Sequence, residues 1–409
     1  MSVTKLVFTK VVAICLVSTC ALAVSKPKLQ VLYSFAGKAD GNGPRAALLQ
    51  DSAGNLYGTT AFGGKGQCAG RAYGCGTVFE LSPPQGSGTD WTEQVLYRFS
   101  GGSDGGGPIG RLIADQSGNL YGTAFEGGNA DCGENGTCGL VFELSPPSQP
   151  GGNWKETVIH SFTGYDGGLP QAGLTFDNNG NLYGTASYNQ NSPGCGGTIF
   201  ELTPPQSQGE DWTYSDLYDL TDLGTGCLPL SDLIFDNLGN LYGTTCTGDL
   251  SGGGVVFELA PPEVEGEPWL YSVLYGFAQN TCPRAGLASD SEGNLYGTAT
   301  NIAFELEPSG GGIWSLQILS SLVYSYAGVI LHNEGKIYGT ESGNGCGSVF
   351  RLANSEGRWI KQRYSLSNNS GLPCAPQGAL IFGTNQTSVF ATSETGGTYK
   401  KGTVFVIAQ

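Results

Sequence analysis

Three of the eight arginines in this 409-residue chain, Arg45, Arg111 and Arg284, stand a few residues before a recurring hairpin aspartate. A guanidinium group presents a planar fork of N–H donors that matches the two oxygens of a carboxylate. Because the chain carries a net charge of −16, these clustered cations predict a site for an anionic group, such as a uronic acid or another carboxylate. The alternative is structural, with the arginines paired to Asp232 and to loop carbonyls.

Alignment of the repeat copies on the hairpin aspartate gives two sets of seven positions. The first ring is Arg45, Ile109, Gln171, Leu230, Arg284, Tyr326 and Gln377. Two residues further along, the second ring is Ala47, Arg111, Gly173, Asp232, Gly286, Gly328 and Ala379. The predicted ligand-binding residues are the polar and aromatic members Arg45, Arg111, Gln171, Asp232, Arg284, Tyr326 and Gln377.

Other motifs that could carry catalysis or bind a metal have structural explanations. GGSDG matches the GxSxG nucleophile pattern around Ser103, but no helix is expected to follow it. His160 falls in an outer strand, and His332 stands where other copies have the hairpin aspartate. DNNGN resembles part of a calcium loop but lacks the distal glutamate. We therefore predict no catalytic residue, no metal site and no cofactor.

The elements that must position these residues are copies of one repeat. GNLYGT begins at Gly54, Gly118, Gly180, Gly239 and Gly293, and GKIYGT begins at Gly335. One unit, residues 170–220, contains four short apolar segments bounded by Gly, Pro, Asn or Asp, which is typical of strands. We expect DNNGN to be a hairpin with an Asx-turn at Asp177 and a glycine of positive φ. The glycine of LYGT predicts a close backbone approach or a bulge.

Seven copies predict an all-β, seven-bladed β-propeller with four antiparallel strands per blade. The fourth segments carry only six tryptophans, which we expect to pack the outer strands: Trp91, Trp154, Trp212, Trp269, Trp314 and Trp359. The last copy stops after its third strand, so the N-terminal strand at 29–35 should close the last blade. In such a ring the first strands line a central channel, and the two rings of residues form its mouth.

The expected propeller is one domain from residue 24 to residue 409. Its blades are expected at about 42–100, 104–163, 168–221, 228–277, 282–322, 325–366 and 375–409, the last completed by 27–36.

Ten cysteines follow residue 23, an even number with no CxxC pair and only two histidines in the chain, which favours disulfides over metal ligation. The loop between the second and third strands of a blade lies on the same face as the loop that leads into the next blade. Pairing on this basis predicts Cys68–Cys75, Cys132–Cys138, Cys195–Cys227, Cys246–Cys282 and Cys346–Cys374.

Residues 1–23 have the pattern of a secretory signal peptide, with Lys5 and Lys10 before a short apolar run and a small-residue cleavage site ending at Ala23. The alternative is a lipoprotein signal with Cys20 as the lipidated residue, for which Thr19 is a poor preceding residue. We expect an exported protein, extracellular or periplasmic, with no transmembrane segment after cleavage.

Removal of residues 1–23, which hold two lysines and no acidic residue, changes the net charge from −16 to −18. A chain this acidic is unsuited to nucleic acid, whose phosphates require basic stripes. It is equally unsuited to an anionic membrane surface, and the charge favours solubility.

NLYGTT, followed by a glycine-rich loop and GTVFEL, resembles the secreted bacterial tandem-repeat proteins called GloVer-containing or choice-of-anchor proteins. The resemblance covers nearly all of the chain after residue 23 and implies a secreted, β-propeller-like repeat protein. It implies no particular chemistry. Such proteins often carry a C-terminal anchor, and no anchor is expected here.

Two functions follow from these observations. The first is an exported, non-catalytic binding or scaffold propeller, monomeric, that recognises a glycan or other anionic ligand at the channel mouth, or a surface protein. The alternative is a propeller enzyme that acts on polysaccharide as a lyase or hydrolase. An enzyme of that kind needs an acid/base pair at the mouth, where the sequence predicts Asp232 alone.

Overall fold

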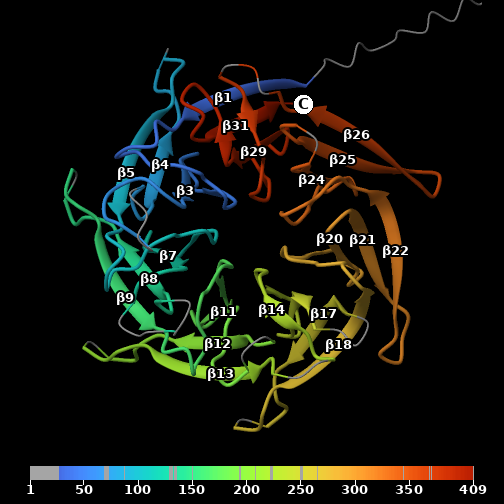
Figure 1. Cartoon of the computed structure of the whole chain (residues 1–409). Coiled ribbons are helices and arrows are strands. Elements are labelled where there is room, and N and C mark those ends of the chain that lie inside the picture. The colour runs from blue at the N-terminus through green and yellow to red at the C-terminus, as the bar shows by residue number, and fades with distance from the viewer. Residues whose placement is uncertain are drawn as a thin grey trace, which may run out of the picture.

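Seven antiparallel sheets are arranged in a ring around a common axis in the computed structural model (Figure 1). The structure describes residues 27–408 except 69–72, 87, 129–131, 133–135, 150, 193–194, 208, 222–223, 249–251, 265, 344, 368 and 370. The described chain forms strands and no helix, so the prediction of a seven-bladed β-propeller is confirmed. The expected signal peptide, 1–23, with Cys20, lies outside the described residues.

Each sheet is one blade, numbered 1 to 7 in the order of the first strands. The first strands are β2 (Leu49–Gln50), β6 (Ile113–Ala114), β10 (Thr175–Phe176), β15 (Ile234–Phe235), β19 (Ala288–Ser289), β23 (Ile330–Leu331) and β28 (Ile381–Phe382). The second strands are β3 (Leu56–Thr60), β7 (Leu120–Ala124), β11 (Leu182–Ala186), β16 (Leu241–Thr247), β20 (Leu295–Ala299), β24 (Ile337–Glu341) and β29 (Ser388–Ser393).

The outer half of each blade contains its third and fourth strands. The third strands are β4 (Thr77–Ser82), β8 (Leu140–Ser145), β12 (Thr198–Thr203), β17 (Gly252–Ala260), β21 (Ile302–Pro308), β25 (Ser348–Ser355) and β31 (Thr403–Ala408). The fourth strands are β5 (Thr92–Arg98), β9 (Lys155–Ser161), β13 (Thr213–Asp219), β18 (Leu270–Ala278), β22 (Trp314–Ser321), β26 (Arg358–Ser365) and β1 (Lys28–Ser34). Three short strands are added: β14 (Cys227–Pro229), β27 (Pro373–Cys374) and β30 (Thr395–Gly396).

The first strands are shorter than the sequence predicts. Of the expected segment 172–177, only Thr175 and Phe176 join the sheet ladder. The preceding backbone turns its carbonyl to the neighbouring blade instead, where Ala172 O accepts a hydrogen bond of 2.8 Å from the side chain of Thr123. These residues are therefore held by side chains of the adjacent blade rather than by strand pairing.

The N-terminal strand closes the ring as predicted. β1 is antiparallel to β31, with Leu29 opposite Ile407 and Ser34 opposite Thr403, and blade 7 has the order β28-β29-β31-β1. In Figure 1 the blue β1 lies beside the red β31. The two ends of the described chain thus share one sheet, and two exposed strand edges are removed.

The repeated letters encode packing inside each blade. Gly58 pairs with Phe79 across β3 and β4, and a Cβ on Gly58 would lie 2.5 Å from Phe79 Cζ. The predicted close approach is therefore to a phenylalanine ring. The hairpin aspartate works as expected: Asp177 Oδ1 accepts from the N–H groups of Asn179 and Asn181, and Gly180 has a φ of 88°.

The tryptophans pack between blades. Trp91, Trp212 and Trp269 each lie about 6 Å, centroid to centroid, from the motif aromatic of the preceding blade, namely Phe390, Tyr121 and Tyr183. Trp154, Trp314 and Trp359 belong to the corresponding clusters with Tyr57, Tyr242 and Tyr296. The expected structural role of the tryptophans is confirmed, and in blades 1 to 6 the tryptophan joins the fourth strand to the second strand of the preceding blade.

Two of these interfaces also bury a carboxyl group. Burial raises the pKa of Glu93 to about 7, and the nearby charge of Asp40 adds to the shift. Burial likewise raises the pKa of Glu156 to about 7, and the nearby charge of Asp104 makes a smaller contribution. Both residues occupy the second position of a fourth strand. The interface between blades 7 and 1 therefore contains Glu93, and the interface between blades 1 and 2 contains Glu156, each with a pKa of about 7.

Candidate functional site at the channel mouth

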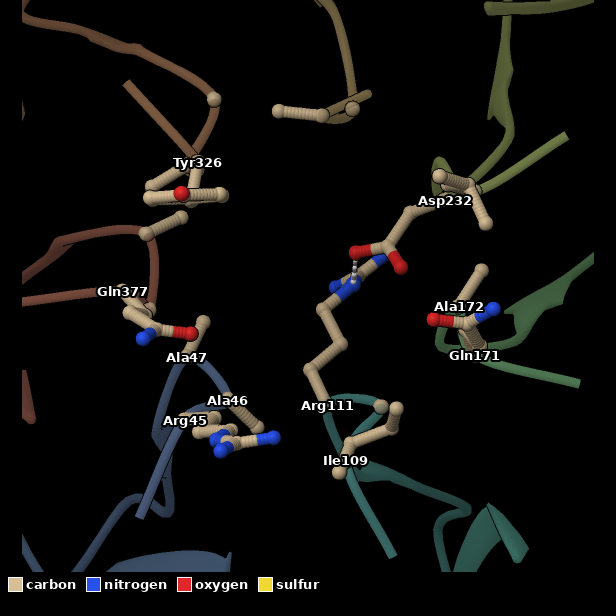
Figure 2. A pocket seen from close by; sticks show the side chains of 18 of the residues that line it. Arg45, Ala46, Ala47, Ile109, Arg111, Gln171, Ala172, Asp232, Tyr326 and Gln377 are labelled. Atoms are coloured by element: carbon tan, nitrogen blue, oxygen red, sulfur yellow. Dashed lines mark hydrogen bonds and ion pairs between the residues drawn. The ribbon is translucent and has the colours of Figure 1, made fainter. Parts of the chain in front are cut away.

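A cavity of about 130 Å³ lies where the seven chain segments preceding the first strands converge. Its lining includes residues from both predicted rings: Arg45, Ala47, Ile109, Arg111, Gln171, Leu230, Asp232, Arg284, Gly286, Tyr326, Gly328, Gln377 and Ala379. Gly173 of the second ring does not line the cavity but donates its N–H to Asp232 Oδ1 at 2.5 Å. Figure 2 shows labelled members of the lining extending toward the centre.

The motif threonine holds these converging segments in place. In six of the seven blades, the threonine of the second strand donates its hydroxyl to the carbonyl between the two ring positions of the next blade. The bonds are Thr59 to Gly110 O (3.4 Å), Thr123 to Ala172 O (2.8 Å), Thr185 to Ser231 O (3.2 Å), Thr244 to Ala285 O (3.3 Å), Thr298 to Ala327 O (2.8 Å) and Thr392 to Ala46 O (2.8 Å). The LYGT motif therefore positions the site without contributing to it.

Arg111 and Asp232 form an ion pair along one side of the channel (Figure 2). Arg111 Nε donates to Asp232 Oδ2 at 2.6 Å, which joins blade 2 to blade 4. The arginine passes directly over Gly173 of blade 3, where a Cβ would lie 2.5 Å from Arg111 Cγ. The second-ring glycine is thus required by the route of the arginine side chain.

Arg45 is neutralised by a carboxylate that neither ring contains. Its Nη2 lies 2.5 Å and its Nε 3.1 Å from Glu394 Oε1, and Gln377 donates to the other oxygen of Glu394. Phe62 lies under the guanidinium, 5.3 Å from ring centroid to Cζ. Sequence alignment missed Glu394 because it follows the second strand, four residues after the motif aromatic Phe390.

Arg284 has a different environment from the other two arginines. Its Cζ lies 5.1 Å from the ring centroid of Tyr326, whose residue surface is 39% exposed. Its Nη2 contacts Cys246 Sγ at 3.8 Å. Among the described residues, no carboxylate forms an ion pair with Arg284.

The sequence allows two roles for the arginines, structural ion pairing and ligand binding, and the three arginines differ in which role their contacts fit. Arg111 and Arg45 form the structural pairs, one with the expected Asp232 and one with Glu394. Three guanidinium groups and these two carboxylates leave the described mouth with one excess positive charge. In a chain of charge −16, that excess favours an anion.

Five disulfides hold the loops around the mouth, and they join the pairs of cysteines that the sequence predicts: Cys68–Cys75, Cys132–Cys138, Cys195–Cys227, Cys246–Cys282 and Cys346–Cys374. The last three connect blade 3 to 4, blade 4 to 5 and blade 6 to 7. Because Cys282 is two residues from Arg284, its disulfide restrains the backbone next to that guanidinium.

The two histidines lie elsewhere and have structural contacts. His160 Nε2 is 3.0 Å from Asp166 Oδ2, and its ring stacks on Tyr214 at 4.2 Å, between two outer strands. His332 takes the place of the hairpin aspartate, with Nδ1 accepting from the Glu334 N–H at 3.2 Å. Within the part of the chain that the structure describes, no group of three or more His, Cys, Asp or Glu residues could hold a metal ion. The described part also contains no helix that could cross a membrane.

Comparison with known proteins identifies the repeat and the fold. The family model described as the Gloeobacter/Verrucomicrobia repeat matches residues 20–148 and 130–328. No curated protein matches the chain.

Solved structures of similar fold include virginiamycin B lyase from Staphylococcus aureus, at 12% identity and a TM-score of 0.55, covering 94% of this chain and 99% of that one. A catalytically inactive variant of that lyase with quinupristin matches at 13% identity and a TM-score of 0.57, covering 94% and 100%. A putative 6-phosphogluconolactonase from Bacteroides uniformis matches at 11% identity and a TM-score of 0.50, covering 80% and 87%. At these identities the likeness establishes the fold alone.

Proposed function

We propose that this chain, which belongs to the Gloeobacter/Verrucomicrobia repeat family, is an exported, non-catalytic binding propeller that recognises a carboxylate at the channel mouth. A glycan that carries a uronic acid is the first ligand to test. The observation that carries the proposal is the state of Arg284, which faces the exposed ring of Tyr326 and has no ion-pair partner among the described carboxylates.

The chemistry of the two residues suits an acidic sugar. The guanidinium can donate two parallel hydrogen bonds to a ligand carboxylate. The exposed tyrosine face can pack against the apolar face of a pyranose ring. Gln171 and Gln377 also line this cavity, and their amide N–H groups donate to Ser187 and Glu394. Arg45 and Arg111, already paired, would shape the site rather than bind the carboxylate directly.

Export is part of the proposal. Support comes from the signal-like segment at 1–23 and from the five disulfides, which persist in oxidising compartments. The disulfides also restrict the loops that form the mouth, and a restrained site loses less entropy when a ligand binds.

The alternative function, a polysaccharide lyase or hydrolase, requires an acid/base pair whose side chains converge at the mouth. Both carboxylates of the described mouth, Asp232 and Glu394, are held by arginines. The same purified protein, incubated with every glycan that binds, should release no new reducing end or unsaturated product. Turnover of a bound glycan would favour the enzyme over the binding protein.

The direct test is a binding screen on the chain from residue 24 onward with acidic and neutral oligosaccharides. We expect selective binding of uronate-containing glycans, with an affinity at least tenfold weaker in Arg284→Gln, since a hydrogen bond to a charged group contributes about 1.5–3 kcal/mol. Arg358→Gln, at an exposed arginine of β26, is the matched control and should bind like wild type. Equal binding of neutral and acidic glycans, or an unchanged affinity in Arg284→Gln, would reject the carboxylate site.

A further inference from the structure

A second cavity, of about 340 Å³, adjoins the mouth cavity on the inner side of the second ring. The two cavities share six lining residues, of which Ala47, Gly286, Gly328 and Ala379 are small, while Arg111 and Asp232 form the ion pair. We name this second cavity the inner chamber. Its volume lies within the range of about 300–1,000 Å³ of small-molecule pockets.

The boundary between mouth and chamber, the passage that a ligand chain would follow, is lined by small residues on one side. At the second-ring positions of blades 5, 6, 7 and 1 the chain has glycine or alanine. A larger residue cannot replace Gly328, because its Cβ would lie 2.4 Å from the carbonyl oxygen of Gly286. The Arg111–Asp232 pair fills the opposite side of the ring, as Figure 2 shows.

The walls of the inner chamber are aliphatic. Ile234, Ala288, Ile330, Leu331 and Ile381, all on first strands, are half-buried and line it. Apart from Arg111 and Asp232 at its boundary with the mouth, no ionisable residue lines the chamber. An apolar group that covers these aliphatic side chains removes their surface from water and is stabilised.

We propose that the channel binds an amphiphilic carboxylate, whose aliphatic chain occupies the inner chamber while its head group lies among the mouth arginines. The head-group assignment rests on the proposed function; the chain assignment rests on the chamber. The juxtaposition selects among anions, because a uronate has no apolar chain and stops at the mouth, whereas a medium-chain fatty acid or an acylated acidic sugar fills both cavities.

The test is a calorimetric titration of the disulfide-intact protein with sodium butanoate, hexanoate and octanoate. Burial of one methylene raises affinity by about fourfold, so we expect octanoate to bind at least tenfold more tightly than butanoate. Ala288→Leu adds volume inside the chamber and should reduce this difference to less than threefold while leaving butanoate unchanged. Ala379→Leu, at the passage, is a second variant in case the first disturbs the fold.

Two controls separate the chamber from the mouth. Ala114→Leu changes an exposed first-strand alanine that does not line the chamber, and should keep the wild-type dependence on chain length. Arg284→Gln should weaken all three ligands by the same factor.

The outcomes are distinguishable. The proposal that the inner chamber binds the aliphatic chain is overturned if butanoate and octanoate bind with equal affinity. It is also overturned if the dependence on chain length persists in both Ala288→Leu and Ala379→Leu. Neither result contradicts the anion site at the mouth. If Arg284→Gln leaves the affinity for the alkanoates unchanged, the proposed function is overturned. The assignment of the carboxylate head group to the mouth is overturned with it.

Discussion

Arg111 Nε lies 2.6 Å from Asp232 Oδ2, although 121 positions separate the two residues in the chain. The pair connects blade 2 to blade 4 over a glycine of blade 3, and Asp232 also accepts the Gly173 N–H. The pair therefore closes part of the channel, and it neutralises the charge of one of the three arginines at the mouth. The balance of charge at the mouth depends on this contact, as does the separation of the mouth from the inner chamber.

Asp232→Asn should strengthen anion binding while it weakens the fold. The change leaves Arg111 without its carboxylate and adds one unit of positive charge to the mouth. We expect a several-fold gain in affinity for a uronate or alkanoate at low salt, reduced at high salt. The free energy of unfolding should fall by about 1–3 kcal/mol, since a charged hydrogen-bonded partner is lost. Titration calorimetry and denaturant unfolding measure the two effects, and Asp211→Asn, at an exposed residue, is the control.

The motif threonine can be tested with a comparison that the chain itself supplies. Thr123→Val removes the donor to Ala172 O and should lower the free energy of unfolding by about 1–2 kcal/mol. Thr340 occupies the same position in blade 6, but its buried hydroxyl has no hydrogen-bond partner among the described residues. Thr340→Val should therefore be neutral or stabilising in the same urea titration. Equal losses in both variants would show that the hydroxyl does not hold the mouth segments.

The buried carboxyl groups predict how stability varies with pH. The pKa values of Glu93 and Glu156 are raised from 4.5 to about 7 in the folded protein. Between these values the folded state binds protons that the unfolded chain has released, so stability should decrease as pH rises from about 4.5 to about 7.

Replacement by a neutral isostere should remove that dependence. The double variant Glu93→Gln/Glu156→Gln is expected to show a smaller fall in Tm between pH 5 and pH 8 than wild type, with the larger gain at the higher pH. Glu263→Gln, at an exposed loop residue, should follow the wild-type curve. A double variant whose Tm falls as steeply as that of wild type would contradict the assignment.

The disulfides should differ in their contributions to stability. Replacement of Cys246 and Cys282 by alanine opens a loop with a separation of 36 residues, and replacement of Cys68 and Cys75 opens one of 7. Loop-closure entropy predicts losses of about 4 and about 2 kcal/mol, respectively. Denaturant unfolding of the two alanine pairs under non-reducing conditions measures the difference. The Cys246/Cys282 variant should also bind acidic ligands more weakly, because the backbone next to Arg284 is no longer restrained.

Much of the fold follows from the repeated letters, because each letter makes the same contact in every copy, either within its blade or to the neighbouring blade. Asp51 closes a hairpin with the N–H groups of Ala53 and Asn55, and Gly58 accommodates the ring of Phe79 opposite it. These contacts join residues within one hairpin or one strand pair, so the spacing of the residues in the sequence predicts which of them touch. The number of blades was predictable from counting these local units. The closing strand, the disulfide partners and most residues of the mouth were predictable because each segment has a fixed place in the repeat.

What only the tertiary structure decides is which side chains meet across the ring. Arg45 and Glu394 are 349 residues apart, and no periodicity predicts that they touch or that Arg284 meets Tyr326 instead of an acid. The inner chamber likewise depends on how far seven sheets approach one another. The sequence by itself determined the blades and the residues brought to the axis, because local hydrogen bonds and packing repeat with the motif. The tertiary structure decided the charge and shape of the channel, because these arise where the copies differ.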